Sequence, residues 1–135
     1  MKTRDAVSRL KRFEVEEKQR KVAEIETMIG DFSQMAQDLD RQIAVEQERA
    51  GVSDTNHYAY PTFAKAAIQR RDNLLASAAD LEAKLMSARE KLAEAFEELK
   101  KIELLEERDA ERMKIEQART AELSAVAGMP HRVAS

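Results

Sequence analysis

The apolar residues of the chain form two stripes with coiled-coil spacing. Successive members lie alternately three and four residues apart, which places each stripe on one narrow face of a helix. The first stripe consists of Val22, Ile25, Ile29, Phe32, Ala36, Leu39 and Ile43. The second consists of Leu74, Ala78, Leu81, Leu85, Ala88, Leu92, Ala95, Leu99 and Ile102. The pattern predicts two long helices that bury their stripes against each other.

A single break, Gly51–Pro61, separates the two stripes. Gly51 can take the left-handed conformation that ends a helix, Ser53–Asn56 is rich in turn-forming side chains, and Pro61 suits the first turn of a second helix. We therefore expect an all-α fold in which two long helices form an antiparallel coiled-coil hairpin. The expected parts are a helix at about 4–50, a connector at 51–60, a helix at about 61–127 and a frayed tail at 128–135. Together they form one coiled-coil domain, 1–135.

A hairpin closed at this connector pairs the two helices position by position. The expected pairs are Ile43 with Arg70, Ala36 with Ala78, Phe32 with Leu81, Ile29 with Leu85, Val22 with Leu92 and Val15 with Leu99. At ~1.5 Å per residue the first helix is about 70 Å long and the second about 100 Å. Beyond about Asp109 the second helix has no partner, so we expect an overhang of about 30 Å with a weak apolar face. The half nearer the termini should be the less stable one, because polar residues interrupt its stripe.

The composition agrees with long helices. Charged residues make up 36% of the chain, hydrophobic ones 43% and aromatic ones only 4%. The net charge of −3 and the pI near 5.6 give no general attraction to nucleic acid. Cysteine is absent, which excludes disulfides and thiolate metal sites and fits a reducing cytoplasm. The first residues do not resemble a signal peptide, and no stretch has the roughly 20 apolar residues that span a bilayer.

The first 21 residues are locally basic, with eight Lys or Arg against four acidic residues. This segment is either a solvated helix face or a basic end that docks on an acidic partner or on lipid headgroups. Arg9, Lys11 and Arg12 are its candidate binding residues.

Both tyrosines, one of the four phenylalanines and one of the two histidines lie within seven residues at the connector: His57, Tyr58, Tyr60 and Phe63. They form either a plug at the end of the helix pair or a binding tip, since Tyr offers a large contact area at low entropic cost. Arg70 and Arg71 follow closely, but the acidic surroundings disfavour a nucleic-acid role.

No catalytic constellation stands out. His57 and His131 have no second ligand at metal spacing, and the three glycines do not form a phosphate loop. We expect a protein that is not an enzyme and that needs neither a metal nor a cofactor.

Four stretches carry a family resemblance: Arg9–Val15, Met35–Asp40, His57–Ala67 and Arg70–Leu74. Together with the two-helix pattern, they resemble the FliJ family, the stalk protein and general chaperone of the bacterial flagellar type III export apparatus. The sequence is most similar to the alphaproteobacterial form, and the resemblance covers nearly the whole chain.

The resemblance implies a stalk similar to the coiled coil of the rotary ATPase γ subunit. Its terminal ends would enter the hexameric export ATPase, and it would contact the export gate membrane protein and escort flagellar export chaperones. It implies a cytoplasmic location, peripheral to the inner membrane, with no direct insertion and no nucleic acid. The basic end and the overhang at 109–127 would be the ATPase end. Phe63 matches an aromatic residue of the family's gate-binding surface and Leu39 an aliphatic one, whereas Ala67, Arg70 and Leu74 depart from the enteric pattern.

Two other interpretations stay open. The chain is alternatively a structural or tethering coiled coil that associates with itself and has no link to secretion. A coiled-coil finger that enters a polymerase channel would need several carboxylates at the hairpin tip, where only Asp54 is present.

Overall fold

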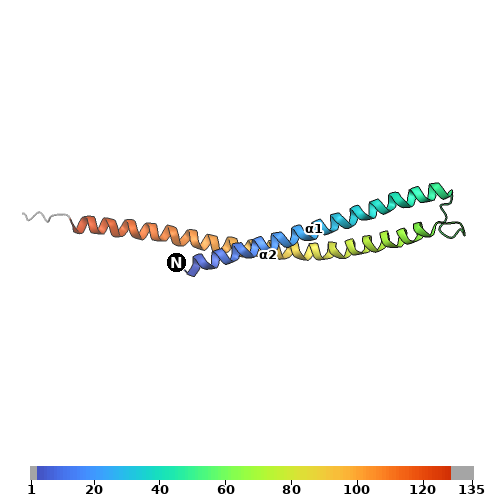
Figure 1. Cartoon of the computed structure of the whole chain (residues 1–135). Helices are drawn as coiled ribbons and strands as arrows, with labels where there is room; N and C mark the ends of the chain where they lie inside the picture. The colour runs from blue at the N-terminus through green and yellow to red at the C-terminus, as the bar shows by residue number, and fades with distance from the viewer. Residues whose placement is uncertain (1–2, 129–135) are drawn as a thin grey trace, which may run out of the picture. The chain divides into compact units, whose positions relative to one another are not determined.

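The structure is a computed structural model that describes residues 3–128, with side chains from Asp5 onward. It contains two helices, α1 (Thr3–Ala50) and α2 (Thr62–Ala127), and no strand among the described residues (Figure 1). This confirms the all-α helical hairpin with a longer second helix. The expected frayed tail from Met129 onward, with His131, lies outside the described residues.

The chain divides into two compact units, which are described separately. The hairpin unit is Glu16–Glu94. The terminal unit joins the chain up to Val15 with the chain from Ala95 onward. The expectation of a single domain over 1–135 stays a prediction.

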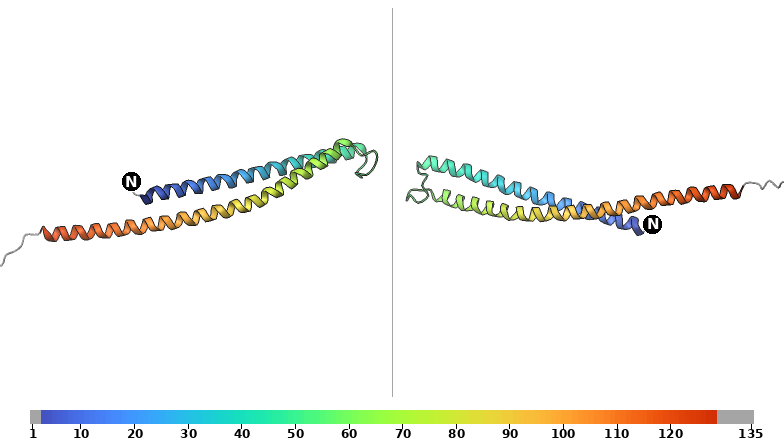
Figure 2. Two further views of the ribbon diagram at one scale, coloured as in Figure 1. Left: turned by 90° about the horizontal axis from the view of Figure 1, so that it is seen from below. Right: turned by 180° about the vertical axis from the view of Figure 1, so that it is seen from behind.

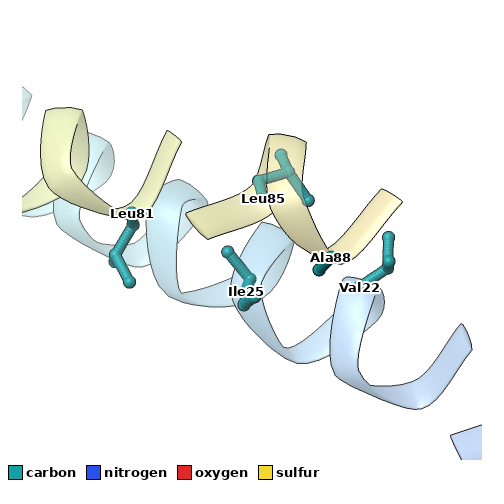
Figure 3. Packing of buried hydrophobic residues seen from close by; sticks show 5 residues of the cluster. All are labelled: Val22, Ile25, Leu81, Leu85 and Ala88. Carbon is teal, nitrogen blue, oxygen red and sulfur yellow. The ribbon is translucent and has the colours of Figure 1, made fainter. Parts of the chain in front are cut away.

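The hairpin unit is held together by the two apolar stripes. Its helices lie side by side and run in opposite directions (Figures 1 and 2). One cluster contains Val22, Ile25, Leu81, Leu85 and Ala88, against which Ile29, Phe32 and Leu92 pack. In Figure 3, Ile25 of α1 points toward α2 between Leu81 and Ala88. A second cluster contains Leu39, Ile43 and Ala67, with Ile68 and Leu74 beside it. Each fully buried aliphatic side chain contributes about 1.5–3 kcal/mol, so these clusters carry most of the unit's stability.

Ion pairs across the hairpin unit follow the same pairing of positions. An Arg71 Nη1 donates to Asp40 Oδ1 at 2.9 Å, and Arg89 lies 3.8 Å from Glu26. Such exposed pairs contribute about 0–1 kcal/mol each. They therefore mark the register, which the apolar stripes set.

Gly51 ends α1 as the sequence predicts. Its φ is 70°, the left-handed region that glycine adopts without steric cost. Its N–H donates to the carbonyl oxygens of Gln47 at 2.9 Å and Glu48 at 3.2 Å, which satisfies acceptors that the helix end leaves open.

The connector then turns through a network of local hydrogen bonds. The N–H of Asn56 donates to the Asp54 carboxylate at 2.9 Å, and the N–H of His57 donates to the Asp54 carbonyl at 3.1 Å. α2 begins at Thr62, one position after Pro61, near the start that the sequence indicates. The Pro61 carbonyl accepts from the Lys65 N–H at 3.2 Å, so Pro61 is the capping residue that precedes the first turn.

The terminal unit buries much less of α2. Val15, Ala95 and Leu99 are buried, and α2 extends past the start of α1 in this unit (Figure 2). Every residue from Ala110 to Gly128 is exposed. The overhang predicted beyond about Asp109 is therefore present as helix up to Ala127.

Candidate partner-binding surfaces

Tyr58 is the most exposed aromatic residue of the connector. Its side chain is 95% exposed and stacks on the His57 ring, with ring centroids 4.6 Å apart. The His57 Nδ1 accepts a hydrogen bond from the Ala59 N–H at 3.0 Å, which fixes the orientation of the imidazole. The stack thus presents a pre-oriented aromatic face to solvent.

Tyr60 has the opposite environment. It is only 5% exposed, and its hydroxyl accepts a hydrogen bond from the Gln47 side-chain amide at 2.9 Å. Tyr60 therefore closes the end of the helix pair, which is the plug interpretation, while Tyr58 remains free to contact a partner. The two tyrosines do not form one surface.

Phe63 lies on a shallow groove formed by both helices. It is 56% exposed and shares the groove with Val45, which is 51% exposed, and with Arg41, Gln42 and Glu46. Sequence reasoning missed Val45 because it lies off the apolar stripe of α1. The predicted hairpin could have indicated that Val45 lies near Phe63, because it brings the end of α1 beside the start of α2.

Leu39 belongs to the core of the hairpin unit. It is 9% exposed and packs in the cluster with Ile43 and Ala67. Its place in the first stripe explains this burial, so its surface is already used within the hairpin and is not offered to a partner.

The basic end does not present Arg9, Lys11 and Arg12 as one group. The Lys11 ammonium donates to Glu98 of α2 at 2.8 Å and to Glu14 at 3.3 Å. The hydrogen bond to Glu98 is the larger cause that raises the pKa of Lys11, and the bond to Glu14 is the next. The Lys11–Glu98 hydrogen bond in turn lowers the pKa of Glu98. Arg9 and Arg12, three residues apart on one side of α1, are both exposed.

The part of α2 from Leu104 onward, which includes the overhang, carries a series of exposed apolar side chains. They are Leu104, Leu105, Met113, Ile115, Leu123 and Val126. Leu104 and Leu105 border a hollow together with charged residues, among them Lys101 and Glu111.

The described residues contain no group of three or more acidic or His side chains placed to hold a metal ion. Neither described helix combines the length and the apolar content required to cross a bilayer.

No family model matches the chain, and no curated protein and no solved structure matches it either.

Proposed function

We propose that this chain is a non-enzymatic component of the flagellar protein export apparatus. It acts as a stalk and adaptor that inserts into the export ATPase ring, contacts the export gate and escorts substrate chaperones. The four stretches that resemble the FliJ family support this proposal, and so does a fold made of two paired helices. In this role the chain is cytoplasmic and reaches the inner membrane only through the export gate.

The observation that carries the proposal is the uncovered part of α2. Residues 110–128 are all exposed, yet 110–127 are helical. Isolated helices of this length are marginal in water, and most helices in proteins are stabilised by packing. Exposed aliphatic side chains on such a helix are typical of a surface that another protein covers. A ring that encloses the terminal unit would supply that cover.

The charges near the start of α1 fit the same role. Arg9 and Arg12 are both exposed. Exposed cations at the leading end of the stalk would steer it into an acidic pore, because complementary charge raises association rates.

The ATPase assay tests this end of the molecule. We expect Arg9→Glu with Arg12→Glu to abolish stimulation of the purified export ATPase, while helicity measured by circular dichroism is retained. The matched control is Lys65→Glu with Arg70→Glu, which changes net charge equally at exposed positions of the other unit. Full stimulation by the Arg9 and Arg12 variant would refute this assignment.

The connector is the proposed gate contact. Tyr58 and Phe63 are exposed, so Tyr58→Ala with Phe63→Ala should remove gate binding at a nearly unchanged melting temperature. Tyr60→Phe is the control, because it alters a buried hydroxyl and should leave gate binding intact. Retained binding by the double variant would exclude this tip as the contact.

The second candidate is self-association, and the same exposed aliphatic residues favour it. Sedimentation equilibrium decides between the two, since a monomer has a mass of 15.3 kDa. A stable dimer that Leu105→Asp with Ile115→Asp dissociates, with no ATPase bound by either form, would replace the export proposal.

A further inference from the structure

A groove runs between α1 and α2 on one side of the hairpin unit. Its floor is apolar and consists of Ile25, Leu81 and Ala88, whose packing Figure 3 shows. Met28 adds a flexible apolar side chain, 44% exposed, on the α1 side. The groove is thus apolar at its base and open to solvent above.

The sides of this groove are strongly cationic. They carry five basic residues and two acidic ones: Lys18, Arg20, Lys21, Lys84 and Lys91 against Glu17 and Glu24. The chain as a whole has a net charge of −3, so this face differs in sign from the rest of the molecule.

These five cations make no close ion pair with the described part of the chain. Within residues 5–128 none of them forms an ion pair, although Lys11 and Arg71 each hold a carboxylate at 2.8 and 2.9 Å. Like charges crowded along one groove repel each other, and an acidic ligand would relieve that repulsion.

Lys84 and Lys91 are spaced for a helical ligand. They lie seven residues apart on one face of α2, about 10.5 Å along the axis. Between them the groove is lined by Ser87 and Ala88, which are small and allow close approach. A partner helix that lies along the groove presents residues seven positions apart on the same face, so two of its side chains can meet Lys84 and Lys91.

We propose that this groove binds an acidic amphipathic helix of a protein partner. The apolar stripe of that helix packs on the exposed Met28 and on the aliphatic stems of the groove lysines, and carboxylates one heptad apart on its flank meet Lys84 and Lys91. The groove is separate from Arg9, Arg12, Tyr58 and Phe63, so the proposal goes beyond the export assignment and does not depend on it.

Other anionic ligands suit the groove less well. Single-stranded nucleic acid is bound by cations interleaved with aromatic rings, and no aromatic residue lines this groove. A lipid surface requires apolar side chains that protrude, whereas Ile25, Leu81 and Ala88 are recessed at 4%, 8% and 9% exposure.

The test is binding of a labelled synthetic helix of about 21 residues, with Leu at seam positions and Glu on both flanks, measured by fluorescence anisotropy with the full chain. A second peptide with Lys in place of every Glu is the matched ligand. We expect binding of the Glu peptide only, weakened at least about tenfold by Lys84→Glu with Lys91→Glu and reduced at about 0.5 M salt. The control variant, Lys65→Glu with Lys100→Glu, has the same net charge and should bind as the unaltered chain does.

Four results would overturn the proposal. The first is that the Glu peptide does not bind, and the second is that the Lys peptide binds equally well. The third is that the control variant loses as much affinity for the Glu peptide as the Lys84 and Lys91 variant does. The fourth is that a uridine oligonucleotide binds more tightly than the Glu peptide and that the Lys84 and Lys91 variant loses this binding. A dimer of the unaltered chain that the same variant dissociates would assign the groove to a second copy instead. None of these results bears on the ATPase assay, so the two proposals fail independently.

Discussion

The hairpin unit and the terminal unit use the same two helices but bury them differently. In the hairpin unit, Ile25 and Leu85 are each 4% exposed, whereas in the terminal unit Leu105 is 44% and Leu123 63% exposed. All four are aliphatic residues on long α-helices. Residue spacing decides which face a helix offers, and the presence of a second helix decides whether that face is buried.

The packed part of the terminal unit also has a less apolar core. Ser8 lies one heptad before Val15, at the heptad position where the hairpin unit has Val22, Ile29, Ala36 and Ile43. It is 2% exposed, and its hydroxyl has no hydrogen-bond partner among the described residues. A buried hydroxyl without a partner costs about 1–3 kcal/mol, so we expect the terminal unit to open first.

The largest expected effect comes from removing a core leucine. Leu85→Ala should destabilise the chain by about 2–5 kcal/mol, because it leaves a cavity between the paired helices. Leu123→Ala makes the same chemical change in the overhang and should alter stability by less than about 0.5 kcal/mol. Urea unfolding followed by circular dichroism measures both. Similar midpoints for the two variants would mean that the overhang is covered in solution.

Ser8→Ala should act in the other direction. Removing the unpaired buried hydroxyl is expected to stabilise the chain by about 1 kcal/mol. Ser87→Ala, at an exposed position of α2, gives the gain in helix propensity alone. The difference between the two melting temperatures isolates the hydroxyl. If Ser8→Ala gains no more than Ser87→Ala, the weak packing of the terminal unit has another cause.

Much of the fold follows from the sequence because apolar spacing has a simple physical meaning. The two stripes predicted the hairpin, and the first stripe already contained Leu39, whose burial limits its use by a partner. The surfaces were less predictable. Tyr58 and Tyr60 lie two residues apart in one connector, and only the folded turn and Gln47 make one exposed and the other buried.

The basic end shows the same limit. Lys11 and Arg12 are adjacent cations in the sequence, yet Lys11 is engaged because Glu98 lies opposite on α2. Glu98 lies 87 positions from Lys11 in the sequence. The predicted pairing of the two helices locates such a partner only to within about one turn, because a long side chain can reach different turns of the facing helix. The cationic groove was missed for a related reason, because its charges come from two distant segments.

A pair of glycine substitutions tests how firmly the connector closes the hairpin unit. Gly51→Ala should destabilise the chain by about 1–2 kcal/mol, because φ is 70° there and a Cβ is strained in that region. Gly30→Ala should stabilise it by about 0.5–1 kcal/mol, because Gly30 is helical and a Cβ would meet nothing within 4 Å. Thermal unfolding of both variants should give shifts of opposite sign. A shift of the same sign would contradict the role of Gly51 as the end of α1.

The smallest expected effect is the pH dependence of the terminal unit. The Lys11 ammonium lowers the pKa of Glu98 below its ordinary value of 4.5, so the folded state favours the ionised carboxylate. The stability from this pair is therefore fully present above the unfolded pKa and is lost as the pH falls through the lower, folded one. The effect is small because both groups are in contact with solvent. Glu98→Gln should lower the melting temperature slightly near neutral pH and not at about pH 3, and Glu97→Gln, an exposed neighbour, is the matched control. A constant difference between the Glu98 variant and the unaltered chain at all pH values would show that the ion pair does not hold the terminal unit together in solution.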